Sequence, residues 1–171
     1  IGFCLVGSEM CIRDRIEFFR SWIPLKTISG SETHPLGTSG EYLVASKFER
    51  LGIKTERVDR DEDDLWCKTP DGNFFTVEVK TSQKPSVEER RKTQYSFGMK
   101  HGKTMWKSDV AVFVAFDLER IIVVSTKNLS TRVRILPSVF TQSIENKLLT
   151  QLLKFPPYSL EEIKCLAQSD K

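Results

Sequence analysis

Two side chains of opposite charge, Glu78 and Lys80, stand two positions apart in the segment Phe74–Ser82. The Val, Thr and Phe residues of this segment predict a β-strand. Because side chains alternate faces along a strand, the carboxylate and the ammonium would share one face, roughly 7 Å apart at the backbone. Burying these two charges in an apolar strand costs free energy unless they form an ion pair or take part in a reaction. The two residues therefore form either a solvent-facing pair on a half-exposed strand or part of a reactive site.

Asp64 is the residue that favours a reactive site. It opens a short predicted strand, Asp64–Lys68, and the turn-forming residues Thr69–Asn73 would fold this strand into a hairpin with the strand that carries Glu78. Two carboxylates near a backbone carbonyl offer the hard oxygen ligands that Mg²⁺ or Mn²⁺ prefers. Such a metal can polarise a phosphodiester oxygen and lower the pKa of a bound water. The ammonium of Lys80 can orient that water or stabilise charge on the phosphorus.

The helix that precedes these strands carries a third acid. Apolar side chains recur at helical spacing over residues 38–51, and Gly52 supplies the stop. Thr38 or Ser39 would cap this helix, which would place Glu41 in its first turn. Acids in the first turn are favoured by the helix dipole whatever their function, so Glu41 alone does not indicate a site.

The remaining elements are predicted from apolar patterns and turn residues. Residues 109–116 (DVAVFVAF) are nearly all apolar, as expected for a strand that is covered on both faces. The order of a helix, three strands, a basic segment, two strands and further helices predicts one α/β domain around a mixed sheet. The other expected elements are a loop at 27–39, strands at 53–58 and 120–125, and helices at 138–153 and 160–167.

The size and composition of the chain limit its class. The 171 residues suit one domain, which we place at residues 27–171, and 39% hydrophobic with 29% charged residues predicts a soluble globular protein, expected in the cytoplasm and without a membrane partner. The net charge of +3 is too small to indicate nucleic-acid binding by itself. Residues 1–26 are set apart, because Ile1–Arg15 resembles a translated sequencing-adapter tract found in proteins predicted from metagenomic reads.

Cysteine and histidine do not indicate a metal site. None of the four cysteines lies in a Cys-x-x-Cys spacing, and the chain has two histidines, so a zinc site is not expected. Cys67 lies within a predicted strand and is interpreted as a small core residue.

The strand signature D-x13-E-V-K, from Asp64 to Lys80, resembles that of the PD-(D/E)XK nuclease superfamily, which includes many restriction endonucleases and the archaeal Holliday-junction resolvases. Gly40-Glu41 is similar to the acid-bearing first helix of the resolvase-like branch. The resemblance covers Gly37–Ser125. It implies a restriction-endonuclease-like core, with a mixed central β-sheet flanked by helices in αβββαβ order.

The resemblance also implies a role for each residue of the motif. Asp64 and Glu78 would bind Mg²⁺ or Mn²⁺, with the carbonyl of Val79 as a third ligand. Lys80 would assist the attacking water, and Glu41 would bind or orient the metal through a water. The implied activity is that of a metal-dependent DNA endonuclease, resolvase-, repair- or restriction-like, acting on duplex or branched DNA. A homodimer would supply the two sites that cutting two strands needs.

One departure from the family pattern leaves the choice of aspartate open. Asp63 stands where the family has a proline, and the acidic run at 59–64 makes Asp63 the competitor of Asp64. Asp64 is preferred because it abuts Leu65 and keeps the phase of the strand.

A basic segment follows the strand that carries Lys80. Seven basic residues and two acids lie between residues 84 and 107, with Tyr95, Phe97 and Trp106 among them. This composition is expected of a phosphate-contacting surface with stacking groups, or of a solvated face whose aromatic residues lie in the core. The predicted nucleic-acid contacts are Lys84, Arg90, Arg91, Lys92, Lys100, Lys103 and Lys107.

Two other classes of function compete with the nuclease. The first is a nucleic-acid-binding or assembly module that keeps the fold without catalysis. The second is an α/β domain whose acids and lysines decorate its surface. The presence of all four motif side chains favours the nuclease, because loss of activity usually removes a ligand or the lysine.

Overall fold

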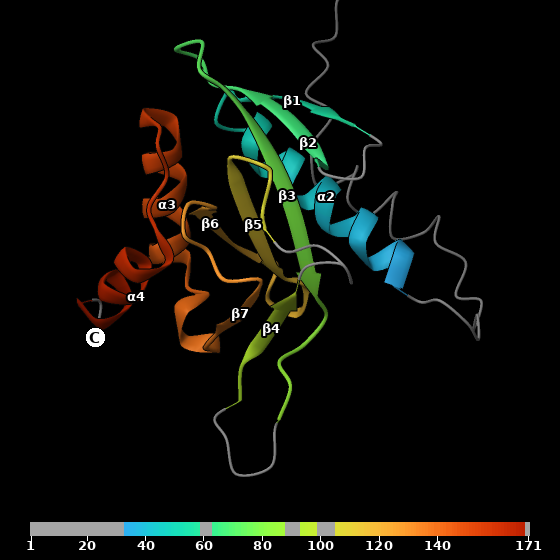
Figure 1. The fold of residues 1–171 in the computed structure, drawn as a ribbon, viewed down its shortest axis with the longest axis vertical. Coiled ribbons are helices and arrows are strands. Elements are labelled where there is room, and N and C mark those ends of the chain that lie inside the picture. Colours follow the sequence, from blue (N-terminus) through green and yellow to red (C-terminus); the bar gives the residue numbers. More distant parts are fainter. Residues whose placement is uncertain (1–32, 59–62, 88–92, 99–104, 170–171) are drawn as a thin grey trace, which may run out of the picture. The chain divides into compact units, whose positions relative to one another are not determined.

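The computed structural model describes residues 33–58, 63–87, 93–98 and 105–169, drawn as a coloured ribbon in Figure 1. Residues 1–26, which the sequence analysis separated from the domain, lie outside the described residues. So do five of the predicted DNA contacts: Arg90, Arg91, Lys92, Lys100 and Lys103.

A five-stranded mixed sheet forms the centre of the fold, in the order β1-β2-β3-β5-β6 (Figure 1). β1, β2 and β3 are antiparallel, β3 pairs with β5 in parallel, and β5 pairs with β6 antiparallel. The predicted hairpin and the predicted mixed α/β fold with flanking helices are therefore confirmed. The strands are β1 (Lys54–Arg57), β2 (Leu65–Lys68), β3 (Phe74–Ser82), β5 (Val110–Ala115) and β6 (Arg120–Ser125).

The first described helix starts earlier than predicted. It begins at Thr33, so the predicted loop is helical from that residue on. Ser39 is therefore not a cap: it lies inside the helix, where its hydroxyl donates to the carbonyl of Pro35 at 2.8 Å. Pro35 is tolerated because N–H groups in the first turn have no intrahelical partner. Glu41 consequently lies about two turns past the helix start and not in the first turn.

The helices of the described part are α2 (Thr33–Glu49), α3 (Gln142–Lys154) and α4 (Leu160–Ser169), with short 3-10 turns η1 (Phe116–Leu118) and η2 (Pro137–Val139). None of these described helices combines the length and the apolar character that crossing a membrane would take.

Helix α2 and the residue that follows α3 pack on the same face of β3. The ring of Phe75 lies 6.4 Å from that of Phe48 on α2 and 5.5 Å from that of Phe155, the residue after α3. Because side chains alternate along a strand, Glu78 and Lys80 stand on the opposite face. All six residues of β5 are buried. The prediction that this strand is covered on both faces is therefore confirmed.

A second, two-stranded sheet covers part of that opposite face and was not predicted. β4 (Tyr95–Gly98) pairs antiparallel with β7 (Arg132–Ile135), and β4 stands in the described part of the connection where the αβββαβ order expected a helix. Phe97 packs against Phe113 of β5, with ring centroids 4.8 Å apart.

The aromatic residues of the basic segment are core residues and not stacking groups for nucleic acid. Tyr95 is 1% exposed, Phe97 2% and Trp106 8%. The indole N–H of Trp106 donates to the carbonyl of Ser130 at 2.9 Å, so its polar edge is also used inside the fold. The stacking interpretation of these three residues is therefore wrong.

Cys67 is buried on β2, as predicted, and this burial makes its chemistry testable. Burial raises the pKa of the Cys67 thiol to about 12, whereas Cys165 on α4 is exposed. Since the thiolate is the nucleophile, we expect iodoacetamide at pH near 8 to alkylate Cys165 and to leave Cys67 unmodified. Peptide mass mapping before and after unfolding in urea checks this. Equal labelling of both cysteines in the native protein would contradict it.

Candidate functional site

Asp64 fastens the start of β2 to the middle of β3. Its backbone N–H donates to the carbonyl of Val77 at 2.9 Å, and its Oδ2 accepts the backbone N–H of Val79 at 2.6 Å. Just before the first paired residue of β2, the side chain of Asp64 thus takes the place of a backbone carbonyl as the acceptor for the Val79 N–H. Its carboxylate lies beside the residue between Glu78 and Lys80.

Glu78 and Lys80 form an ion pair on β3. Lys80 Nζ lies 2.5 Å from Glu78 Oε1, with 17% and 5% of the two side chains exposed. The solvent-facing interpretation of this pair is wrong, because Glu78 as a whole is only 4% exposed. A buried carboxylate is tolerated when a cation compensates it, and Lys80 supplies that cation for Glu78.

The donor atoms near Asp64 suit a small, hard cation. In a β-strand the N–H and C=O of one residue point to the same side, so the carbonyl of Val79 points the same way as the N–H that Asp64 accepts. Asp64 and Glu78 each keep a second carboxylate oxygen besides the one in these contacts. Over the described ranges, no three side chains of Asp, Glu, His or Cys form a metal-binding group. Carboxylate and carbonyl oxygens are the ligand types that Mg²⁺ takes, with waters in its remaining positions.

Asp63 is engaged elsewhere. Its Oδ1 accepts the hydroxyl of Ser108 at 2.8 Å, and its Oδ2 lies 3.5 Å from the indole nitrogen of Trp66. Ser108 lies two residues before the first residue of β5, so Asp63 links the start of β2 to the segment that leads into that strand. Of the two aspartates, Asp64 is the one that contacts β3 at Val79.

Glu41 is bonded to β1. Its Oε2 accepts Nη2 of Arg57 at 2.7 Å and Nε at 3.0 Å, and the guanidinium lies 4.5 Å above the ring of Tyr42. The structure therefore brings Asp64, Glu78 and Lys80 together at β3, while Glu41 pairs with an arginine.

Two bonding partners of the acids, Arg57 and Ser108, were not predicted. Arg57 lies 16 residues from Glu41, and Ser108 lies 45 residues from Asp63. Neither carries a motif or a spacing signal. A single clue was available for Arg57, which is the basic residue at the end of a strand expected to follow the helix that carries Glu41.

The helix backbone touches β3 next to Lys80. A Cβ atom added to Gly40 would lie 1.9 Å from Oγ1 of Thr81, a distance that no real contact reaches. That hydroxyl is buried and has no hydrogen-bond partner in the described part of the chain. Glycine at this position lets α2 pack closely on the face of β3 that carries Thr81, opposite to the face of Glu78 and Lys80.

Gly40→Ala is therefore expected to lower the free energy of unfolding by about 1–3 kcal/mol, because the methyl group overpacks the contact with Thr81. Gly37 is the matched control, since nothing lies within 4 Å of its added Cβ on the same helix. Gly37→Ala should stabilise by up to about 1 kcal/mol through helix propensity. Urea unfolding followed by circular dichroism measures both, and a Gly40→Ala variant as stable as Gly37→Ala would refute the close approach.

Two of the predicted DNA contacts lie in the described part, and both are exposed. Lys84 follows the end of β3, and its carbonyl accepts the hydroxyl of Ser82 at 3.1 Å. Lys107 directly precedes Ser108, the residue that bonds to Asp63. Both lysines therefore lie on segments that adjoin the candidate site.

Comparison with known proteins identifies the fold. No family model and no curated protein sequence matches this chain. Among solved structures, the bacterial homing endonuclease I-Ssp6803I is similar, with a TM-score of 0.51 and 18% sequence identity over 63% of this chain and 77% of that chain. At this identity the likeness is one of fold: a mixed α/β arrangement with a central mixed sheet flanked by helices.

Proposed function

We propose that this protein is a metal-dependent endonuclease that hydrolyses DNA phosphodiester bonds at Asp64, Glu78 and Lys80, in the manner of the PD-(D/E)XK superfamily. The fold that it shares with a homing endonuclease supports a DNA substrate. Resolvase-, repair- and restriction-like roles are all compatible with the site. A homodimer would bring two such sites to the two strands of a duplex.

One observation carries the proposal. The Asp64 carboxylate accepts the Val79 N–H at 2.6 Å, next to an ion pair in which Glu78 is buried and Lys80 keeps 17% of its side chain exposed. A buried ion pair is a weak source of stability, because desolvation offsets its attraction. Two carboxylates and a lysine gathered at one strand are better explained as parts of a reactive site.

The acidic side chains and the lysine would have different roles in hydrolysis: the acids would bind the metal, and the lysine would stabilise charge on the substrate. Asp64, Glu78 and the Val79 carbonyl would hold Mg²⁺ or Mn²⁺, which polarises a phosphodiester oxygen and lowers the pKa of a bound water. Lys80 is partly exposed, so its ammonium can reach a substrate at the surface. There it would orient the attacking water and stabilise the negative charge that develops on the phosphate.

Glu41 stays a predicted outer ligand of this site. Its carboxylate is bonded to Arg57, so an interaction with the metal through a water would have to coexist with that pair or replace it. The same observation favours the second candidate function, a nucleic-acid-binding module without catalysis, since an engaged Glu41 leaves the site with fewer acids.

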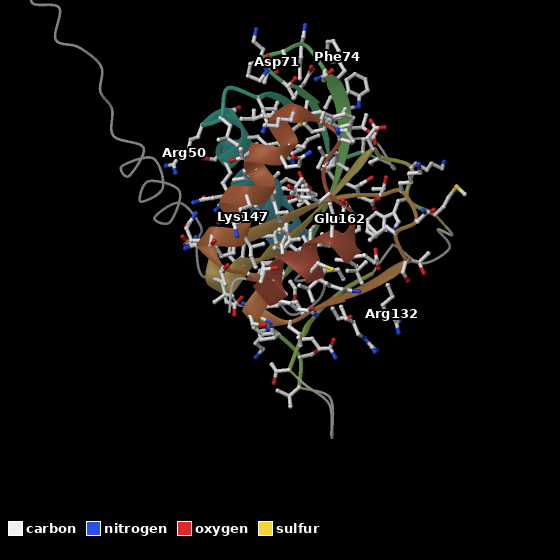
Figure 2. The ribbon with its side chains drawn as sticks, turned by 90° about the vertical axis from the view of Figure 1, so that its left-hand side faces the viewer. Arg50, Asp71, Phe74, Arg132, Lys147 and Glu162 are labelled. Carbon is white, nitrogen blue, oxygen red and sulfur yellow. The ribbon has the colours of Figure 1, made fainter. Side chains whose placement is uncertain are left out.

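Cleavage of labelled branched, duplex and single-stranded DNA by the full chain tests the proposal. We expect cutting with Mg²⁺ or Mn²⁺, none after chelation with EDTA, and loss of cutting in Asp64→Asn, which keeps the shape of the side chain but removes its charge. Asp71→Asn is the matched control, because Asp71 is an exposed residue of the β2–β3 turn (Figure 2).

The outcomes separate the two candidate functions. Metal-dependent cutting that survives Asp71→Asn and fails in Asp64→Asn supports the nuclease. Salt-sensitive DNA binding without cutting on any substrate would replace it with the binding module. Cutting that persists in Asp64→Asn would refute the assigned site.

A further inference from the structure

The outer face of the β4–β7 sheet is basic. Along both strands buried and exposed residues alternate, so Tyr95, Phe97, Val133 and Ile135 point inward. The four exposed residues of the two strands are Ser96, Gly98, Arg132 and Arg134.

The register of the two strands places a small residue opposite each arginine. Arg134 lies opposite Ser96, and Arg132 lies opposite Gly98, so each guanidinium faces a small residue across the ribbon. Apart from the two arginines, the exposed residues of the two strands are uncharged. The arginines are two positions apart, roughly 7 Å along the strand. Figure 2 shows the Arg132 side chain extending away from the ribbon.

The inner face anchors the ribbon firmly. Tyr95 packs edge-to-face on Phe140 with centroids 4.9 Å apart, and its hydroxyl donates to Asp117 Oδ1 at 2.7 Å. Phe97 packs on Phe113 at 4.8 Å. The arginines therefore project from a fixed support, which reduces the conformational entropy that is lost when they bind a ligand.

The ribbon lies on the same side of the central sheet as the candidate site. Phe113 is the register partner of Lys80 on the adjacent parallel strand, so both side chains stand on one face of the sheet. In Figure 1, β4 adjoins the end of β3 that follows Lys80. A polymer bound at Lys80 would meet the ribbon as it leaves the site.

We propose that the outer face of the β4–β7 ribbon binds the phosphate backbone of duplex DNA through Arg132 and Arg134, beside the bond to be cut. The substrate class rests on the proposed function. A guanidinium matches phosphate geometry with paired N–H donors, and the outer face has no large apolar side chain that would suit a protein interface. A two-stranded ribbon is also narrow enough to follow a groove of the duplex.

DNA binding by the full chain in EDTA, where the metal-dependent reaction cannot run, tests the ribbon separately from catalysis. Fluorescence anisotropy of a labelled duplex over a series of salt concentrations gives Kd and its salt dependence. Arg132→Ala/Arg134→Ala should raise Kd at least about tenfold, since hydrogen bonds to charged groups are lost. It should also reduce the slope of log Kd against log salt by about 1.8, roughly 0.9 for each phosphate contact.

Two further variants make the test specific. Arg50→Ala/Lys147→Ala removes the same number of positive charges, one just after α2 and one on α3. Both residues lie apart from Arg132 in Figure 2, so this variant should leave Kd within about threefold. Arg132→Lys/Arg134→Lys keeps the charge and should keep the wild-type salt slope. Thermal unfolding confirms that each variant is folded.

The results distinguish failure of the ribbon from failure of the nuclease. Wild-type cutting together with wild-type binding by the double alanine variant would overturn the ribbon and leave the nuclease standing. An equal loss in Arg50→Ala/Lys147→Ala, or a reduced slope in the lysine variant, would overturn it too. Loss of binding in the double alanine variant supports the ribbon even if no substrate is cut.

Discussion

Lys80→Ala is expected to lower kcat for metal-dependent DNA cleavage by about 10²–10³-fold, the usual effect of removing one group that stabilises transition-state charge. Its ammonium is the cation that lies beside Glu78, at 2.5 Å, and 17% of the Lys80 side chain is exposed. Single-turnover cleavage of a labelled duplex measures the loss. The Kd for DNA should change only a few-fold, because a single positive charge is removed from the binding surface.

Stability has to be followed alongside this activity. Removing Lys80 leaves the Glu78 carboxylate buried without its cation, so part of the loss could come from unfolding. Urea unfolding of Lys80→Ala separates the two effects, because a variant that is folded under the assay conditions and still inactive has lost a group that the reaction needs. Glu78→Gln/Lys80→Ala removes the uncompensated charge and should regain stability. Lys164→Ala is the control, since that lysine lies on α4 with 55% of its side chain exposed. Activity of Lys80→Ala close to that of Lys164→Ala would exclude Lys80 from catalysis.

Glu145→Ala is expected to have the largest effect on stability. Glu145 on α3 is 1% exposed, and its Oε1 accepts Lys47 Nζ at 2.5 Å and the Ile121 N–H at 3.3 Å. Since β6 is an edge strand of the described sheet, no further strand of that sheet lies beside this N–H. The substitution strands a partly buried lysine and a backbone donor, which should cost about 3 kcal/mol of unfolding free energy.

Glu161→Ala is the matched control for this prediction. Glu161 pairs with Lys164 at 3.8 Å on α4, and 78% of its side chain is exposed. Such an exposed pair contributes little, so the loss should stay below about 0.5 kcal/mol. Urea unfolding of both variants gives the comparison. If the two substitutions cost the same, Glu145 does not join α2, α3 and the sheet edge as the structure indicates.

Short-range patterns in the sequence were enough to predict the hairpin that carries the candidate site. The turn at Thr69–Asn73, the β-branched run of β3 and the apolar run of β5 each depend on neighbouring residues, and all were found where expected. The common face of Glu78 and Lys80 follows in the same way, because a strand has a period of two.

The start of α2 and the β4–β7 sheet could not be predicted in this way. The Ser, Thr, Gly and Pro residues before residue 40 indicate a loop, yet from Thr33 on they belong to helix α2. This helix packs on β3 where Gly40 meets Thr81. The strands of the second sheet are four residues long, and their partners lie far apart in the chain. Local propensity is too weak over such lengths to compete with tertiary pairing.

By itself the sequence determined which groups meet on β3: a carboxylate at residue 78 and an ammonium at residue 80, the carbonyl of residue 79 between them, and an aspartate from the preceding strand. Only the tertiary structure decided that the Glu78–Lys80 pair is buried, that Asp64 and not Asp63 contacts Val79, and that Glu41 pairs with Arg57. Alternation along a strand is a local property of the backbone. Burial and long-range partners depend on which elements cover that strand, and those elements are contributed by distant parts of the chain.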